Sequence, residues 1–492
     1  MLGVTTTVAA YHLLLVLVLL LLLLLLLFVD GGRCRTSEVE EEERRVVALR
    51  QLEWGESSAP RISSPLISRE HSGATVLQLK HSSRLSRENK DYEHHLRYLL
   101  ISDEERVSWL QSRIKRSIPN NFQKDSSETQ IPLNSGIRLQ TLNYVTAVGI
   151  GGKATTVIVD TGSDLTWVQC KPCVSCYTQQ DPLFDPSLSP SYRSVPCNAT
   201  ACSSSLQAAT GTSGICGNDR TSCYYLVSYG DGSYTRGVLA QERISLGETN
   251  VENFIFGCGR SNRGLFGGTS GLMGLGRTEL SLVSQTTNQF GGVFSYCLPS
   301  RPYNSSGSLV LGSDLSVYKN STPISYTRMI SDPEQQPFYF LNLTGLRVGA
   351  VELQAPGFSN GKVLIDSGTV ITRLAPSVYK ALKDEFVRQF AAYPTAPGFS
   401  ILDTCFNLSG YEEVKVPTLR LGFEGDVQLN VDVTGIFYFV KRDASQVCLA
   451  FASLSYEDQA GIIGNYQQKN QRVVYDTIGS KLGFAQEECS YS

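Results

Sequence analysis

Hydrophobic residues are distributed in three different ways along this chain. An apolar run of 17 residues, Leu13 to Val29, lies near the N-terminus and ends at a charged stretch. From about residue 131, short runs of β-branched and aromatic residues alternate with glycine-containing turns. Between them, one segment repeats apolar residues at helical spacings, namely Leu96, Leu99, Leu100, Val107, Leu110 and Ile114. The pattern predicts an apolar leader, an amphipathic helix and a β-rich body.

The leader has the length of the hydrophobic region of a secretory signal peptide. An uncleaved membrane anchor of marginal length is the alternative, because no basic stretch precedes the run to decide between the two. We interpret residues 1–32 as a cleaved signal peptide. A plastid transit peptide is disfavoured, because such peptides contain few acidic residues and EVEEEERR follows at Glu38 to Arg45.

Residues 33–130 separate the leader from the body and are rich in Glu, Arg and Ser, with few aromatic residues. One interpretation is a solvated linker, and the other is a removable prosegment that docks on the body by its amphipathic helix. We favour the prosegment, because the segment lies between a signal peptide and a cysteine-rich body.

The body contains 12 of the 13 cysteines, from Cys170 to Cys489, an even number that suits six disulfides in an exported protein. The motif CKPCVSC, with Cys173 and Cys176, could also suit a metal knuckle or a redox pair. We favour disulfides in a loop-rich insertion, because four more cysteines follow closely. They are Cys197, Cys202, Cys216 and Cys223.

Five glycosylation sequons agree with a secretory route. Their asparagines are Asn198, Asn304, Asn320, Asn342 and Asn407. We therefore expect a disulfide-bonded glycoprotein of the extracellular space or the vacuole.

Charge and histidine content narrow the possible chemistry. The formal net charge of −3 gives no positive excess for binding nucleic acid. All five histidines lie before residue 96, in the leader and the prosegment. The body therefore lacks the imidazole needed for Ser-His-Asp or Cys-His catalysis, or for a histidine zinc site. If the body is an enzyme, carboxylates are the natural choice for its acid and base.

The body contains one pattern twice. TTVIVDTGSDLTW carries an apolar strand into Asp160, and KVLIDSGTVITRL does the same at Asp366, 206 residues later. An apolar pair closed by glycine follows each motif downstream, in GLMGLG and in GIIGN. A buried carboxylate needs a partner for its charge, and the repeat supplies a second carboxylate.

The repeat predicts two similar β lobes, residues 131–330 and 331–492, each of which gives one aspartate to a shared cleft. Strand-like runs outnumber helical ones in both halves. The clearest helix is predicted over Ala375 to Tyr393, with Pro376 at its start.

Over about residues 140–492 the chain resembles the pepsin-like aspartic proteases, and within them the nepenthesin-type plant subgroup. The resemblance rests on DTGSDLTW, DSGT, the flap-like YGDGS at Tyr229 to Ser233, the glycine-closed pairs and the cysteine-rich insertion. It implies a mainly β, bilobal fold with the active-site cleft between two similar lobes. It also implies an endopeptidase that acts at acid pH on protein or peptide substrates, through a water activated by Asp160 and Asp366, without cofactor or metal. We expect it to be a monomer.

The resemblance assigns supporting roles to the residues that follow the two aspartates. These residues are Thr161, Gly162, Ser163, Ser367, Gly368 and Thr369. The glycines would let the backbone turn tightly under the carboxylates. The first hydroxyl residue of each motif would brace the opposite loop, and the second would hydrogen-bond the outer carboxylate oxygen.

The resemblance also implies a mobile hairpin that closes over the substrate. Its residues are Tyr229, Gly230, Asp231, Gly232 and Ser233. Trp167 would contact the hydroxyl of Tyr229. Asp231 departs from the common pepsin pattern, because this position usually holds a small hydroxyl residue. A carboxylate here changes the charge above the substrate.

Two further expectations concern a disulfide and the prosegment. Pepsin-like proteins commonly bridge the regions of Cys405 and Cys448, so these two should pair. The prosegment should inhibit at neutral pH and leave at acid pH, because its basic residues can pair with body carboxylates only while these are ionised. The nearest basic candidates are in RIKR, Arg113 to Arg116.

Two other functions remain open. A catalytically silent relative acting as an inhibitor or receptor would share the fold, although such chains usually lose an aspartate or its triplet, and both are intact here. A nucleic-acid-binding relative would need a basic patch, whereas the Arg and Lys of the prosegment are nearly matched by Glu and Asp.

Overall fold

The computed structural model describes residues 44–49, 69–71, 74–76, 89–114, 129–135, 139 and 141–489, with gaps at 219, 230–231, 265, 301–305, 315–317, 319–320 and 331–336. The predicted signal peptide and Asp231 lie outside these residues. Within them, no helix combines the length and the apolar character needed to cross a bilayer.

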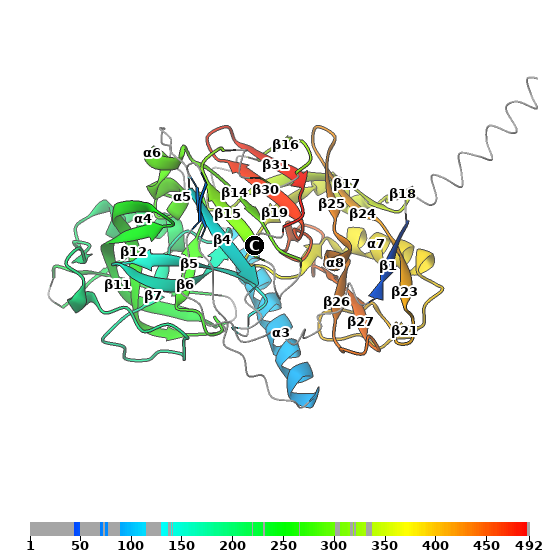
Figure 1. Ribbon diagram of the computed structural model, residues 1–492, viewed down its shortest axis with the longest axis horizontal. Helices are drawn as coiled ribbons and strands as arrows, with labels where there is room; N and C mark the ends of the chain where they lie inside the picture. The colour runs from blue at the N-terminus through cyan, green and yellow to red at the C-terminus, as the bar shows by residue number, and fades with distance from the viewer. Residues whose placement is uncertain are drawn as a thin grey trace, which may run out of the picture.

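The chain is mainly β and has two lobes, as predicted (Figure 1). The strands of residues 129–330 are β4 (Thr129–Ser135), β5 (Tyr144–Ile150), β6 (Lys153–Asp160), β7 (Trp167–Gln169), β8 (Arg193–Ser194), β9 (Ile215–Cys216), β10 (Cys223–Ser228), β11 (Tyr234–Leu246), β12 (Thr249–Arg263), β13 (Gly271–Gly274), β14 (Val293–Cys297), β15 (Gly307–Leu311) and β16 (Ser325–Arg328). Three short helices accompany them, α4 (Ser204–Thr210), α5 (Leu282–Gln285) and α6 (Thr287–Phe290). In the sheet, β6 lies between β5 and β13, so the first repeated motif occupies a central strand.

The second lobe is built from shorter strands. They are β17 (Phe340–Val348), β18 (Val351–Glu352), β19 (Lys362–Ile365), β20 (Thr372–Leu374), β21 (Thr395–Ala396), β22 (Cys405–Phe406), β23 (Glu413–Pro417), β24 (Leu419–Phe423), β25 (Val427–Val431), β26 (Phe437–Phe439), β27 (Val447–Leu449), β28 (Phe451–Ser453), β29 (Gly461–Ile463), β30 (Gln471–Asp476) and β31 (Lys481–Gln486). Strand β19, which leads into Asp366, lies between β17 and β29 in an eight-stranded sheet.

Helix α7 (Pro376–Gln389) begins where the sequence predicted but ends earlier than Tyr393. Beyond Phe390 the chain turns back, and the amide of Tyr393 donates to the carbonyl of Phe390 at 3.1 Å. The two rings pack together with centroids 4.3 Å apart. This aromatic contact favours the turn over a further helical turn. The short α8 (Val433–Ile436) is the other α-helix described in this lobe.

The last two strands join the lobes. β30 pairs with β14, and β31 pairs with β30 and β16, so the end of the chain extends the sheet of the first lobe. The guanidinium of Arg472 on β30 is fully buried, and its Nε donates to Glu487 at 2.9 Å. The disulfide Cys297–Cys489 ties β14 to the segment after β31. These contacts fix the two lobes relative to each other.

Twelve cysteines form six disulfides. The pairs are Cys170–Cys258, Cys173–Cys176, Cys197–Cys216, Cys202–Cys223, Cys297–Cys489 and Cys405–Cys448. The last pair is the one that the resemblance implied. Every sulfur of CKPCVSC is bonded to another cysteine, which excludes the metal knuckle considered for this motif.

Two described parts of residues 33–130, the predicted prosegment, pack on the second lobe. β1 (Arg44–Ala48) adds an antiparallel strand to β23, and α3 (Asn89–Ile114) lies between the lobes (Figure 1). The short strands β2 (Arg69–His71) and β3 (Ala74–Val76) pair with each other. All six apolar residues of the predicted amphipathic face are buried, and most of them pack against side chains of the second lobe. The helix therefore docks by its apolar face.

Candidate active site

The two aspartates stand at equivalent places in the two lobes. Asp160 is the last residue of β6, and Asp366 directly follows β19. β6 pairs in parallel with β13, and β19 with β29, the strands formed by the two glycine-closed pairs. The repeated sequence motifs thus form the same local structure twice. Both carboxylates are fully buried.

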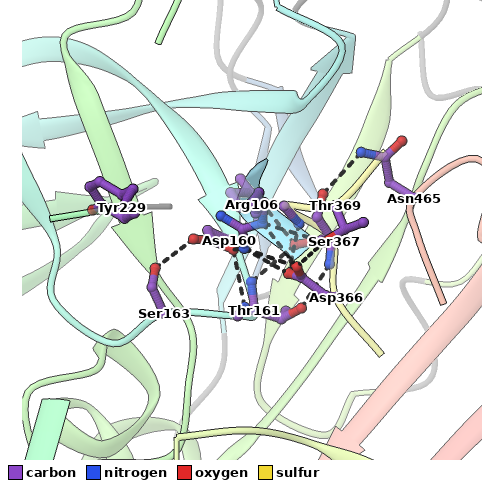
Figure 2. A network of polar contacts seen from close by, with 12 residues as sticks. Arg106, Asp160, Thr161, Ser163, Tyr229, Asp366, Ser367, Thr369 and Asn465 are labelled. Carbon is purple, nitrogen blue, oxygen red and sulfur yellow. Dashed lines mark hydrogen bonds and ion pairs between the residues drawn. The ribbon is translucent and has the colours of Figure 1, made fainter. Parts of the chain in front are cut away.

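The first hydroxyl residues of the motifs brace the opposite loops. The amide of Ser367 donates to Oγ1 of Thr161 at 2.9 Å, and the amide of Thr161 lies 3.1 Å from Oγ of Ser367. Asn465, at the end of GIIGN, donates from Nδ2 to the carbonyl of Ser367 at 3.1 Å (Figure 2). These crossed bonds hold the two aspartate loops together.

Each carboxylate is oriented by one hydroxyl and one amide. Ser163 Oγ donates to Oδ2 of Asp160 at 2.6 Å, and Thr369 Oγ1 donates to Oδ2 of Asp366 at 2.5 Å. The amides of Gly162 and Gly368 donate to Oδ1 of the preceding aspartates at 3.0 and 2.9 Å. Hydrogen bonds of this kind favour ionisation and fix the orientation of the oxygens.

The two glycines are required for a reason other than the tight turn that we expected. Neither has a positive φ. A Cβ on Gly162 would lie 2.6 Å from Oδ1 of Asp366, and one on Gly368 would lie 2.2 Å from Oδ1 of Asp160. Glycine is needed here because each loop closely approaches the carboxylate of the other lobe.

Arg106 of α3 occupies the space between the carboxylates (Figure 2). Its Nη2 lies 2.6 Å from Oδ1 of Asp160 and 2.9 Å from Oδ2 of Asp366, and its Nε donates to Oδ2 of Asp366 at 3.1 Å. The side chain is 14% exposed. One guanidinium therefore forms ion pairs with both aspartates.

The basic residue at the two aspartates is Arg106, which lies outside the RIKR segment named from the sequence. Arg113 donates from Nη2 to the carbonyl of Ala209 at 3.3 Å, and its positive charge acts on the buried carboxylate of Asp164 in the first lobe. Lys115 and Arg116 lie outside the described residues. A signal for Arg106 did exist in the sequence. The apolar series of the helix lacks apolar residues at its central turn, where Asp103 and Arg106 stand on the same face.

Burial and the charge of Arg106 shift the pKa of Asp160 in opposite directions. Burial is the larger effect and raises the pKa of Asp160 above its usual range, and the nearby carboxylate of Asp366 raises it further. The guanidinium of Arg106, with the hydrogen bonds from Ser163 and Gly162, lowers it. The group keeps an affinity for protons that an exposed aspartate would not have.

The flap lies between β10 and β11 and contacts the prosegment. Trp167 Nε1 donates to the hydroxyl of Tyr229 at 2.9 Å, the contact that the resemblance implied. Ser233 accepts from the amide of Tyr229 at 2.8 Å, and Gly232 adopts the left-handed φ of 75° at the turn. The ring of Trp109 on α3 lies 5.7 Å from that of Tyr229. Gly230 and Asp231 fall outside the described residues.

The sequon asparagines differ in accessibility. Asn198 is exposed, whereas Asn342 and Asn407 are half-buried. Oδ1 of Asn407 accepts from the amide of Ser409 at 3.0 Å, within its own sequon. Asn304 and Asn320 lie outside the described residues, and glycosylation stays a prediction at all five positions.

Known proteins resemble this chain along most of its length. The family model described as xylanase inhibitor N-terminal matches residues 144–313, and the one described as xylanase inhibitor C-terminal matches residues 338–486. An aspartyl protease family protein of Arabidopsis thaliana is 43% identical over 415 residues, which is 83% of this chain and 85% of that protein. The chain belongs to the pepsin-like aspartic protease family. Aspartic proteinase nepenthesin-1 of Nepenthes gracilis is 33% identical over 74% of this aspartic protease chain and 81% of that protein.

Solved structures share the fold. The structure of edgp superposes with a TM-score of 0.60 at 21% identity, covering 74% of this chain and 95% of the other. Basic 7S globulin from soybean superposes with a TM-score of 0.58 at 20% identity, covering 74% and 98%.

Asp164 is a second buried carboxylate in the first aspartate motif. Its Oδ1 accepts from the amide of Thr278 at 2.9 Å, and no described residue donates to its Oδ2. Burial raises the pKa of Asp164 to about 7. Between the ordinary pKa of an aspartate and pH 7, the folded state therefore binds a proton that the unfolded chain releases.

We predict that Asp164→Asn removes part of the pH dependence of stability. With Asp164, the free energy of unfolding should fall by roughly 4 kcal/mol as pH rises from about 4 to about 7, because the folded state disfavours the ionised group. The asparagine variant should lose that decrease and be more stable than the wild type near pH 7. Thermal unfolding across this range measures the effect. Asp458→Asn, at an exposed carboxylate, is the control, and a pH dependence in Asp164→Asn equal to that of the wild type would contradict the prediction.

Proposed function

We propose that the chain is the precursor of an aspartic endopeptidase that hydrolyses peptide bonds at acid pH. The observation that carries the proposal is the pair of fully buried, similarly hydrogen-bonded carboxylates contributed by the two lobes. Relatives named aspartyl proteases support it. Family membership alone does not decide the matter, because the matching family models and a structural relative are named for an inhibitor and a globulin.

Two facing carboxylates cannot both ionise cheaply, so they share a proton, as is general for aspartic proteases. The ionised member removes a proton from a water that lies between them, and the protonated member donates to the scissile carbonyl. Attack by the water gives a tetrahedral diol, which collapses when the amine is protonated. Ser163 and Thr369 keep the outer oxygens oriented throughout. The apparent pKa values belong to the pair rather than to either aspartate.

The prosegment is proposed as the inhibitor of this site. Arg106 occupies the position between the carboxylates where the reacting water must stand, and Trp109 lies against the flap tyrosine. No peptide substrate can reach the aspartates while α3 is docked.

Acidification should release the helix. Docking of Arg106 lowers the pKa of Asp160 relative to the free site, so the docked state binds fewer protons there and falling pH favours release. Asp103 acts in the opposite direction, because burial raises its pKa in the docked state. Because the guanidinium of Arg106 lies directly against the catalytic pair, we expect its effect to prevail and the helix to be released in acid.

The secretory route is part of the proposal. Six disulfides among the described residues require an oxidising compartment, which agrees with a cleaved signal peptide and with the extracellular space or the vacuole.

The catalytic roles can be tested with Asp160→Asn, Asp366→Asn and the double variant. Each single change should reduce kcat/KM for a peptide substrate by about 10²- to 10⁴-fold, because the pair loses its shared proton. The double change should cost little more, since the two residues act as one unit. Wild-type activity should be blocked by pepstatin and be insensitive to chelators and to serine or thiol reagents. Substantial turnover by a folded single variant would locate the chemistry elsewhere and favour the silent relative.

The inhibitory role can be tested with Arg106→Gln in the full-length precursor. Removing the cation leaves the aspartates without their prosegment partner, so the variant should become active at a higher pH than the wild type. Activity and prosegment cleavage are followed as pH is lowered from neutral. Glu105→Gln, at an exposed position of the same helix, should activate like the wild type. Identical activation of both variants would exclude Arg106 as the inhibitory group.

A further inference from the structure

Asp103 of the prosegment occupies a carboxylate pocket beside the catalytic site. Its Oδ1 accepts from the amide of Val370 at 2.6 Å, and its Oδ2 accepts from the amide of Ile371 at 3.2 Å. Nη2 of Arg373 lies 3.1 Å from the same Oδ2. Asp103 is 4% exposed and Arg373 is fully buried. Three donors, one of them charged, thus enclose a single carboxylate.

All three donors belong to the body and are continuous with the second catalytic motif. Val370 and Ile371 directly follow Thr369, and Arg373 lies on β20, paired with Ile462 of β29. Nη1 of Arg373 donates to the carbonyl of Ile371 at 2.8 Å, which fixes the guanidinium over the two amides. The pocket is therefore as firmly positioned as Asp366 itself.

The prosegment supplies both carboxylates that pair with Arg373. Nη2 binds Asp103, and Nε donates to Oε2 of Glu104 at 3.1 Å. Both leave with α3. A desolvated guanidinium and two amide donors are costly to leave unpaired, so the pocket will favour an anion in their place.

The pocket lies where a substrate must pass. Asp103 and Arg106 line one hollow together with Tyr229 and Val370. They are three residues apart on a helix, which corresponds to roughly 4.5 Å along its axis. An extended peptide advances roughly 3.3 Å per residue. A substrate residue within two positions of the scissile bond could therefore place its side chain where Asp103 lies.

We propose that this pocket is a subsite for an acidic side chain of the substrate, and that Arg373 determines the preference. The inference rests on the proposed peptidase function. A charge-assisted bond from a guanidinium, together with two amide bonds, is strong for an ionised carboxylate and weak for a carboxamide. The preference is thus for glutamate or aspartate over glutamine or asparagine near the cleaved bond.

Matched peptides test the subsite. The full-length protein is activated in acid, and it is then assayed on peptides that differ only by Glu or Gln at each position within two residues of the cleaved bond. At one position the Glu peptide should have a kcat/KM about 10- to 100-fold above that of the Gln peptide.

Variants assign the preference to Arg373. Arg373→Gln is combined with Asp103→Asn, so that the precursor buries no unpaired carboxylate while it folds. The double variant should cleave Glu and Gln peptides equally, whereas Asp103→Asn alone should keep the preference because the pocket of the body is intact. Arg373→Lys should keep part of it, since a point charge replaces the planar fork.

Equal cleavage of the two peptides by the wild type at every position overturns the inference, and this test needs no variant to fold. A preference that persists in the double variant also overturns it. If neither peptide is cleaved, fluorescence anisotropy of the labelled peptides on the same sample tests the acidic subsite separately from the peptidase function. Tighter binding of the Glu peptide, lost in the double variant, supports the pocket and rejects the peptidase. Equal binding rejects the pocket.

Discussion

Two carboxylates are buried against each other, and this arrangement requires one positive charge or one proton between them. In the precursor the charge is supplied by Arg106, and in the proposed enzyme a shared proton takes its place. Both states satisfy the same electrostatic requirement with different groups. The requirement explains why the proposed inhibitory arginine and the proposed shared proton can replace each other between the same two carboxylates.

Because the site is shared by two lobes, it needs contacts elsewhere in the chain that hold the lobes in a fixed relative position. Neither loop alone provides a complete environment for its aspartate, because each bracing hydroxyl and each closely approaching glycine belongs to the opposite lobe. The two lobes must therefore keep a fixed relative position. Strands β30 and β14, the buried bond from Arg472 to Ser308 and the disulfide Cys297–Cys489 join the lobes and provide this stiffness.

The sequence was most informative where the structure repeats itself. The two aspartate motifs and their glycine-closed strands could be recognised because each is a local pattern, and they predicted the lobes and the shared site. Arg106, Asp103 and Arg373 were missed because their roles depend on how the prosegment docks, which is a contact between distant segments. Charged residues that interrupt the apolar face of α3 were the visible signal, and they were not used. Glycine at positions 162 and 368 was expected for a turn, whereas its reason is contact across the lobes.

Strand β1 gives the prosegment a second attachment. It pairs with β23 over five residues, from Arg44 opposite Pro417 to Ala48 opposite Glu413, away from the catalytic cleft. A helix that leaves the cleft is then still joined to the enzyme through this strand, and its effective concentration near the site stays high. If acid releases the helix as proposed, the opening is reversible for as long as the chain between β1 and α3 is intact. Only cleavage of that connection makes activation permanent, so the lifetime of the link sets how long a neutral environment can still switch the enzyme off.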